Sequence, residues 1–297
     1  MDEVKPILHI NAGVGWSATK PLCYTLEQIG YCHRGETTES NMLYYLYERM
    51  YKPVHAKYYW HTEHKHRGMD FVRKNTTLSW YIEYMKSRIK EGYRGVSDFS
   101  NSNGDLPRQF LKQIAPVLQE EFDVRVTMIW RHPVRRSYSQ ISNWYKNMTD
   151  NDNAPKAWKI RDPEKAEHWQ NIKKTYPDSI SYWKNRISTL GPNLAKFSYV
   201  EIYKKYKYCF DTLPIVMENL WGGKTEELED FLECKLDGLH RNCYYPEMGT
   251  QAPRYEELPD QYMSDMQDLS AADYQFGRNQ LRFIYEEWEN EFGVNPW

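Results

Sequence analysis

The chain has 297 residues, of which 40% are hydrophobic and 15% aromatic, and its formal net charge at pH 7 is -2. This length fits one large α/β domain, and the nearly neutral charge gives no reason to expect a nucleic-acid polymer as partner. The five cysteines form no CxxC pair, which argues against a zinc site or disulfide framework and favours a reducing, cytoplasmic compartment. Because the amino-terminal segment is acidic with only a short apolar run, we expect neither a signal peptide nor a membrane anchor.

Short apolar runs along the chain predict the strands of a mostly parallel sheet. They span residues 7–11, 31–33, 54–60, 95–99, 124–130 and 195–200. The run 124–130 ends in an uninterrupted apolar stretch, which is typical of a strand buried on both faces.

Segments with apolar residues at helical spacing alternate with these runs. They span residues 19–30, 40–50, 78–91, 106–121, 181–190, 225–238 and 271–292, with a further helix opening at Pro133. Strands that alternate with helices predict an α/β fold, in which a mostly parallel sheet is flanked by helices on both faces. We expect a single domain over residues 1–297, with the polar stretch 147–176 as an insertion or lid.

A small, glycine-rich segment lies between the first predicted strand and the first predicted helix. Small residues let the backbone approach a ligand closely, and N–H groups at a helix start attract an anion. The residues that we expect at this anion site are Gly13, Gly15, Trp16, Ser17, Ala18, Thr19 and Lys20. The alternative is a tight turn between strand and helix that binds no ligand.

The same segment leaves the nature of the anion open. It does not match the triphosphate-binding pattern GxxxxGK[ST], but it matches GxGxxA, with Glu36 and Glu39 roughly 20 residues further on. This pattern predicts an NAD(P)-dependent oxidoreductase as one alternative. Against it, the second predicted strand, 31–33, is short and has no acidic residue at its end.

A second segment, residues 128–139, runs from the predicted buried strand into a helix. Arg131 stands at the carboxyl end of the strand, where α/β folds bind ligands. Arg136 and Ser139 lie three residues apart and therefore share one helix face. An arginine offers a planar fork for a phosphate, and a serine a small donor beside it. A solvated basic helix start is the alternative, although two arginines at that position oppose the helix dipole.

Together the two segments resemble the sulfotransferase family. The matching residues are Gly13, Val14, Thr19 and Leu22 in the loop and Arg131, Pro133, Arg136 and Ser139 in the motif RxPxxRxxS. The resemblance implies a P-loop NTPase-like sulfotransferase architecture and the donor 3′-phosphoadenosine 5′-phosphosulfate (PAPS), with adenosine 3′,5′-bisphosphate (PAP) as product. It assigns the 5′ phosphosulfate to the loop and the 3′ phosphate to Arg131 and Ser139.

Looser similarities and two departures accompany this resemblance. Residues 95–99 resemble the family's short strand ahead of the second motif, and Tyr199 falls on a family tyrosine near the adenine. Arg241 is a candidate to close over the nucleotide. Trp16 replaces the usual basic residue of the loop, and His132 replaces the aspartate that follows the first arginine of the motif. A PAP- or PAPS-binding protein without catalytic activity is therefore a further alternative.

The resemblance implies a metal-free, in-line transfer of the sulfuryl group, which depends on positioning and charge stabilisation. Lys20 is the expected cation at the leaving oxygen, because the loop has no other basic residue. The base expected to take the proton of the acceptor hydroxyl is one of His33, His61 and Glu63. The expected acceptor is a small molecule or a carbohydrate.

Overall fold

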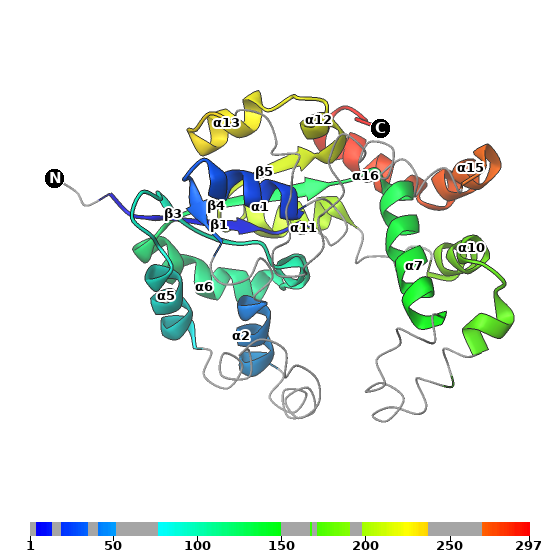
Figure 1. The fold of residues 1–297 in the computed structure, drawn as a ribbon, viewed down its shortest axis with the longest axis horizontal. Helices are drawn as coiled ribbons and strands as arrows, with labels where there is room; N and C mark the ends of the chain where they lie inside the picture. The colour runs from blue at the N-terminus through cyan, green and yellow to red at the C-terminus, as the bar shows by residue number, and fades with distance from the viewer. Residues whose placement is uncertain are drawn as a thin grey trace. The chain divides into compact units, whose positions relative to one another are not determined.

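The computed structural model of the chain describes residues 4–13, 19–34, 41–51, 77–149, 167, 171–190, 198–236 and 269–297. The chain divides into two compact units. The first comprises Met1–Trp130 and Tyr199–Tyr255, and the second Arg131–Ser198 and Glu256–Trp297. Figure 1 shows the elements of both units. The single domain over residues 1–297 stays a prediction.

In the described residues of the first unit, five parallel strands form the sheet. They are β1 (Ile7–Asn11), β2 (Cys32–His33), β3 (Gly95–Asp98), β4 (Asp123–Trp130) and β5 (Asp211–Val216), in the spatial order β2-β3-β1-β4-β5. Ile7 at the start of β1 lies opposite Gly95 on one side and Asp123 on the other. Gly95 has no room for a side chain, because a Cβ there would lie 2.0 Å from the Ile7 carbonyl oxygen. The predicted α/β fold with a parallel sheet is confirmed.

The strand order has a topological switch point at the centre of the sheet, where the chain changes the side of β1 on which it adds strands. From β1 the chain runs to β2 and β3 on one side, and it then crosses to β4 and β5 on the other side. In open parallel sheets, ligands bind beyond the carboxyl ends of the strands at such a switch point. The residues that follow β1 and β4 are therefore where a ligand site is expected.

Helices cover both faces of this sheet. They are α1 (Thr19–Gln28), α2 (Met42–Tyr51), α5 (Leu78–Ser87), the 3-10 helix η1 (Asn101–Asp105), α6 (Arg108–Glu121), α11 (Tyr199–Lys207), α12 (Met217–Trp221) and α13 (Glu226–Leu232). Figure 1 shows α1 and α13 on one side of the strands and α5 and α6 on the other. On the α1 and α13 side, a buried apolar cluster joins Leu22 and Leu228 to Ile129 and includes the thiols of Cys23 and Cys32.

The described part of the second unit is helical. Its helices are α7 (Pro133–Thr149), α10 (Ser179–Leu190), α15 (Ala271–Gln280) and α16 (Arg282–Phe292). Pro133 opens α7 as predicted, at the position where proline is favoured. Trp183 of α10 is fully buried, and its indole N–H donates to Ser137 Oγ over 3.1 Å. A Cβ at Gly277 would lie 2.6 Å from this indole, so α15 has a glycine where the ring packs against it.

Two sequence-based predictions lie largely outside the described residues. Of the predicted lid 147–176, α7 includes the first residues up to Thr149, and residues 171–175 are helical. The predicted strand 54–60 lies wholly outside. In the part of the chain that the structure describes, none of the helices has the length and apolar character needed to cross a membrane.

The predicted strand 195–200 is wrong at its end, because Tyr199 and Val200 begin helix α11. The buried aromatic and aliphatic residues of this helix have helical spacing, at Tyr199, Ile202, Tyr203 and Tyr206. The strand that completes the described sheet is instead β5, which the sequence pattern did not predict. Pro214 interrupts its apolar pattern, and a proline is tolerated there because β5 is the outermost strand on its side of the described sheet.

Helix ends also differ from the predicted ones. The predicted helix 271–292 is two helices, α15 and α16, which are separated at Leu281. Helix α5 ends at Ser87 rather than at residue 91. Helix α13 ends at Leu232, because Glu233 adopts a left-handed backbone conformation with φ 52.

Candidate functional site

The chain turns sharply after β1, between Asn11 and Gly13. The Asn11 side chain accepts the N–H of Gly13 over 2.9 Å and donates to Thr127 Oγ1 on β4 over 3.3 Å. A Cβ at Gly13 would lie 2.8 Å from Asn11 Oδ1 and 3.1 Å from the backbone nitrogen of Ile129. Glycine is therefore required where the loop leaves the sheet, and its N–H is bonded within the turn.

The rest of the predicted anion loop is described only at its end. Thr19 is buried and begins α1, and the backbone of Lys20 continues this helix. The residues of the loop outside the described part are Gly15, Trp16, Ser17 and Ala18. The side chain of Lys20 also lies outside it, so its predicted role at the leaving oxygen stays a prediction.

A buried carboxylate at the end of β3 organises the same edge of the sheet. Asp98 accepts hydrogen bonds from the Ser100 N–H over 3.1 Å, from the Ser100 hydroxyl over 2.5 Å and from the Tyr81 hydroxyl over 3.2 Å. Burial raises the pKa of Asp98, and these hydrogen bonds oppose the rise by favouring the charged form. Asp98 was not among the predicted site residues, although a charged residue near the end of a predicted strand is a usable signal.

Asn103 extends this network to the neighbouring strand. Its amide nitrogen donates to the Asn11 carbonyl oxygen over 3.3 Å and lies 3.4 Å from Asp98 Oδ1. Ser100 adds a third segment, because its hydroxyl accepts the N–H of Asn41 over 2.8 Å. Asn41 has φ 55, a left-handed conformation that asparagine tolerates better than most residues. The ends of β1 and β3 and the start of α2 are thus joined by neutral polar groups around one carboxylate.

His33, one of the predicted bases, ends β2 beside an acidic partner. Its Nε2 lies 3.5 Å from Glu27 Oε1, and Glu27 also pairs with Arg34 over 3.0 Å. Burial is the main cause that lowers the pKa of His33, so the ring is neutral at pH 7, which is the form that a base requires. In the strand register, His33 at the end of β2 lies opposite Val96, two residues before Asp98 on β3. His33 as the base stays a prediction.

The second motif begins directly after β4. Arg131, Arg136 and Ser139 are 2%, 4% and 7% exposed, respectively. The His132 carbonyl oxygen accepts the Arg136 N–H over 2.9 Å and so forms the first turn of α7. Buried arginines are costly unless negative charge or several hydrogen bonds compensate them. These buried side chains differ from a solvated helix start, and the anion site at this segment stays a prediction.

Tyr199, the residue predicted near the adenine, starts α11. Its ring stacks on the indole of Trp130, the last residue of β4, with centroids 5.3 Å apart and planes at 8°. Both side chains are buried. The structure therefore gives Tyr199 a packing partner in the first unit, and a role at the adenine stays a prediction.

Three other predicted site residues, His61, Glu63 and Arg241, lie outside the described part of the chain. Among the residues that the structure describes, no cluster of three or more His, Cys, Asp or Glu side chains could hold a metal ion.

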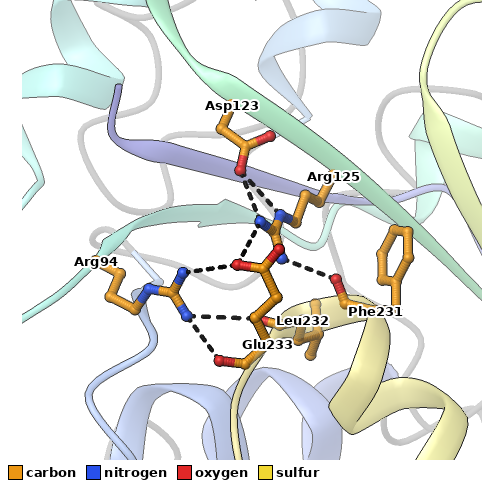
Figure 2. A network of polar contacts seen from close by, with 6 residues as sticks. All are labelled: Arg94, Asp123, Arg125, Phe231, Leu232 and Glu233. Carbon is orange, nitrogen blue, oxygen red and sulfur yellow. Dashed lines mark hydrogen bonds and ion pairs between the residues drawn. The ribbon is translucent and has the colours of Figure 1, made fainter. Parts of the chain in front are cut away.

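The opposite, amino-terminal edge of the sheet contains a network of charged residues (Figure 2). Arg125 on β4 pairs with Asp123 over 2.9 Å and with Glu233 over 3.2 Å, and it donates to the Phe231 carbonyl oxygen over 2.8 Å. Arg94, which precedes β3, donates to the Glu233 carbonyl oxygen over 3.0 Å. The two arginines thus bind the carboxyl end of α13, where a helix favours cations.

The fold and the two edges define an open, parallel α/β protein with a network of mostly neutral polar groups at the carboxyl edge of its sheet. No protein-family model matches the chain, and no curated protein sequence matches it either.

Proposed function

We propose that the chain is a sulfotransferase with a P-loop NTPase-like sulfotransferase architecture. It transfers the sulfuryl group of PAPS to a hydroxyl of a small-molecule or carbohydrate acceptor and releases PAP. The observation that carries this proposal is the placement of the two motif segments. The glycine turn follows β1 and the RxPxxRxxS segment follows β4, and these adjacent strands flank the switch point of the sheet.

The chemistry of the two segments supports a nucleotide with phosphate at both ends. The loop and helix start after β1 suit the 5′ phosphosulfate, because helix N-termini attract anions. Arg131 with Ser139 suits the 3′ phosphate, since an arginine fork and a hydroxyl together bind a phosphate group in a defined orientation. NAD has no additional phosphate that would need the second cationic site at Arg131.

The proposed reaction is a single in-line displacement. The acceptor oxygen bonds to sulfur while the bond from sulfur to the bridging oxygen of PAPS breaks, and PAP leaves with the electron pair. A base among His33, His61 and Glu63 takes the proton of the acceptor hydroxyl. Lys20 stabilises the negative charge that develops on the leaving oxygen.

Ligand-dependent melting tests the proposed donor. PAP is expected to raise the melting temperature by binding the native state, whereas NAD at the same concentration is expected to have little effect. Stabilisation by NAD alone would contradict the proposal and favour the oxidoreductase. Turnover of PAPS that carries a labelled sulfuryl group, screened over phenols and sugars, then separates an enzyme from a protein that only binds PAP.

Calorimetric titration tests the second motif. Arg131→Ala is expected to weaken PAP binding more than Ser139→Ala, because charge-assisted hydrogen bonds are about twice as strong as neutral ones. Adenosine 5′-phosphate, which lacks the 3′ phosphate, is expected to bind both variants about as well as the parent. If both variants keep the parent's preference for PAP, the assignment of the 3′ phosphate to this motif is wrong.

A further inference from the structure

His132, the residue between Arg131 and α7, is held by the last helices of the second unit. Its Nε2 and the hydroxyl of Tyr274 on α15 lie 2.6 Å apart and share a hydrogen bond. The ring also meets Tyr285 of α16 at a centroid distance of 5.7 Å and Trp297 at 6.3 Å. His132 is only 5% exposed, so hydrogen bond and ring contacts together fix the orientation of its side chain.

The backbone of His132 connects this side-chain anchor to the motif. Its carbonyl oxygen accepts the N–H of Arg136, and its own peptide link joins it to Arg131. Pro133, the next residue, has a fixed φ and limits the conformations of the residue before it. A rotation of the His132 ring away from Tyr274 would therefore be transmitted to the turn that carries Arg131.

The surroundings of His132 are cationic. Burial is the main cause that lowers the pKa of His132 to about 3, and the charges of Arg135, Arg278 and Arg131 act in the same direction. Arg278 lies one helical turn after Tyr274 and stacks over the Tyr285 ring at 5.2 Å. A neutral histidine adds no negative charge beside Arg131, in contrast to the aspartate that is usual at this place in the family that the motif resembles.

We infer that Tyr274 and His132 form a positioning pair that holds the turn of Arg131 and thereby sets the preference for a nucleotide with a 3′ phosphate. The inference rests on the proposed function, because it takes Arg131 as the contact of that phosphate. Neither residue of the pair contacts the nucleotide in this arrangement. The pair acts through the placement of the arginine.

The test compares the affinities for PAP and for adenosine 5′-phosphate in the full chain by calorimetry. Tyr274→Phe keeps the ring and removes the hydroxyl that binds His132. It is expected to lower the preference for PAP about three- to tenfold, the effect of one buried hydrogen bond, and to leave adenosine 5′-phosphate binding unchanged. His132→Gln, which keeps a polar group within reach of Tyr274, is expected to lose less of the preference than His132→Leu.

Tyr145→Phe is the matched control, because it removes a hydroxyl of α7 that donates to the Tyr176 carbonyl oxygen over 2.8 Å. It is expected to leave the preference unchanged. Equal weakening of both nucleotides in Tyr274→Phe, or an unchanged preference in both Tyr274→Phe and His132→Leu, would overturn the positioning pair. If Tyr274→Phe does not fold, the comparison of His132→Gln with His132→Leu decides. A parent protein that does not prefer PAP would instead refute the proposed function.

Discussion

The two edges of the same sheet are held by opposite kinds of polar contact. At the amino edge, Arg94 and Arg125 pair with Asp123 and Glu233 and cap α13, so that opposite charges meet within the protein (Figure 2). At the carboxyl edge, the donors around Asp98 are hydroxyl, amide and peptide groups without charge.

This difference indicates different roles for the two edges. The amino-edge network joins the end of a helix to two strands, so we expect it to serve stability. The carboxyl-edge network fixes the turn after β1, the end of β3 and the start of α2, and these segments border the switch point where open sheets bind ligands. Substitutions at the amino edge should therefore change stability alone, whereas those at the carboxyl edge should also change ligand binding.

The largest effect is expected from Asp98→Ala. The substitution leaves the Tyr81 hydroxyl, the Ser100 N–H and the Asn103 amide without their buried acceptor, and we expect a loss of about 3 to 4 kcal/mol in the free energy of unfolding. Urea unfolding measures it. Asp98→Asn, which keeps one acceptor oxygen, is the matched variant and is expected to lose clearly less. Equal losses in the two variants would contradict the expectation that one acceptor oxygen at this position recovers part of the stability.

The next effect, on turnover, concerns Lys20. Loss of one charge at the leaving oxygen is expected to lower kcat about a hundredfold in Lys20→Ala, with a much smaller change in PAP affinity. Arg94→Gln, at the amino edge, is the control and is expected to turn over like the parent. Steady-state rates at saturating PAPS measure both. A Lys20→Ala variant with parental kcat would place the catalytic cation elsewhere in the chain.

A smaller effect on stability is expected from Arg125→Met. Its side chain is 11% exposed, and the substitution removes three partners while it keeps an apolar stem of similar length. We expect a loss of about 2 kcal/mol in the free energy of unfolding with unchanged PAP affinity. Glu233→Gln is the milder companion, because that side chain is 65% exposed, and its effect should shrink as salt is added. Loss of PAP binding in Arg125→Met would break the distinction between the edges.

The smallest effect, per unit of pH, comes from buried histidines. Burial lowers the pKa of both His9 and His132 to about 3, so the unfolded chain binds protons below about pH 6.5 that the folded chain does not. Stability should therefore fall as the pH falls, by about 1.4 kcal/mol per pH unit for each histidine between about pH 6 and 4. Urea unfolding at several pH values gives the slope of the unfolding free energy against pH. In His9→Gln this slope should be smaller by the contribution of one proton, about 1.4 kcal/mol per pH unit. An unchanged slope would contradict the burial of a neutral His9.

Asp98 contributes with the opposite sign. Its pKa is raised in the folded state, so the parent should gain stability relative to Asp98→Asn as the pH falls towards the ordinary range of a carboxyl group. The difference in stability between the parent and this variant should thus widen in acid.

The part of the fold that could be predicted from sequence has uninterrupted local signals. The strand β4 has a long apolar run and α7 begins at a proline, so the bounds of β4 and the start of α7 were predicted close to the observed ones. The strand β5 was not predicted because Pro214 conceals it, and its position at the end of the described sheet, which permits the proline, is a tertiary property. The start of α11 was predicted as strand because tyrosine and valine favour strands locally, whereas packing on Trp130 favours the helix.

The candidate site shows the same division. Arg131, Ser139 and Gly13 belong to motifs with fixed spacing, and these can be found in a single sequence. Asp98 and Tyr274 act through partners that are distant in the chain: Asp98 bonds Tyr81, and Tyr274 bonds a histidine 142 residues away. The spacing of residues within one segment does not predict contacts between distant segments, so these pairs can be identified only once the fold is known.

The positions of the cysteines make thiol reactivity a probe for the opening of one unit. All five, at positions 23, 32, 209, 234 and 243, fall within the first unit, and the second unit has none. Burial raises the pKa of Cys23 to about 12, and Cys32 is equally buried, so neither presents the reactive thiolate while the core is closed. The rate at which an alkylating reagent modifies these two thiols therefore records how often the core of the first unit opens, while the second unit stays silent.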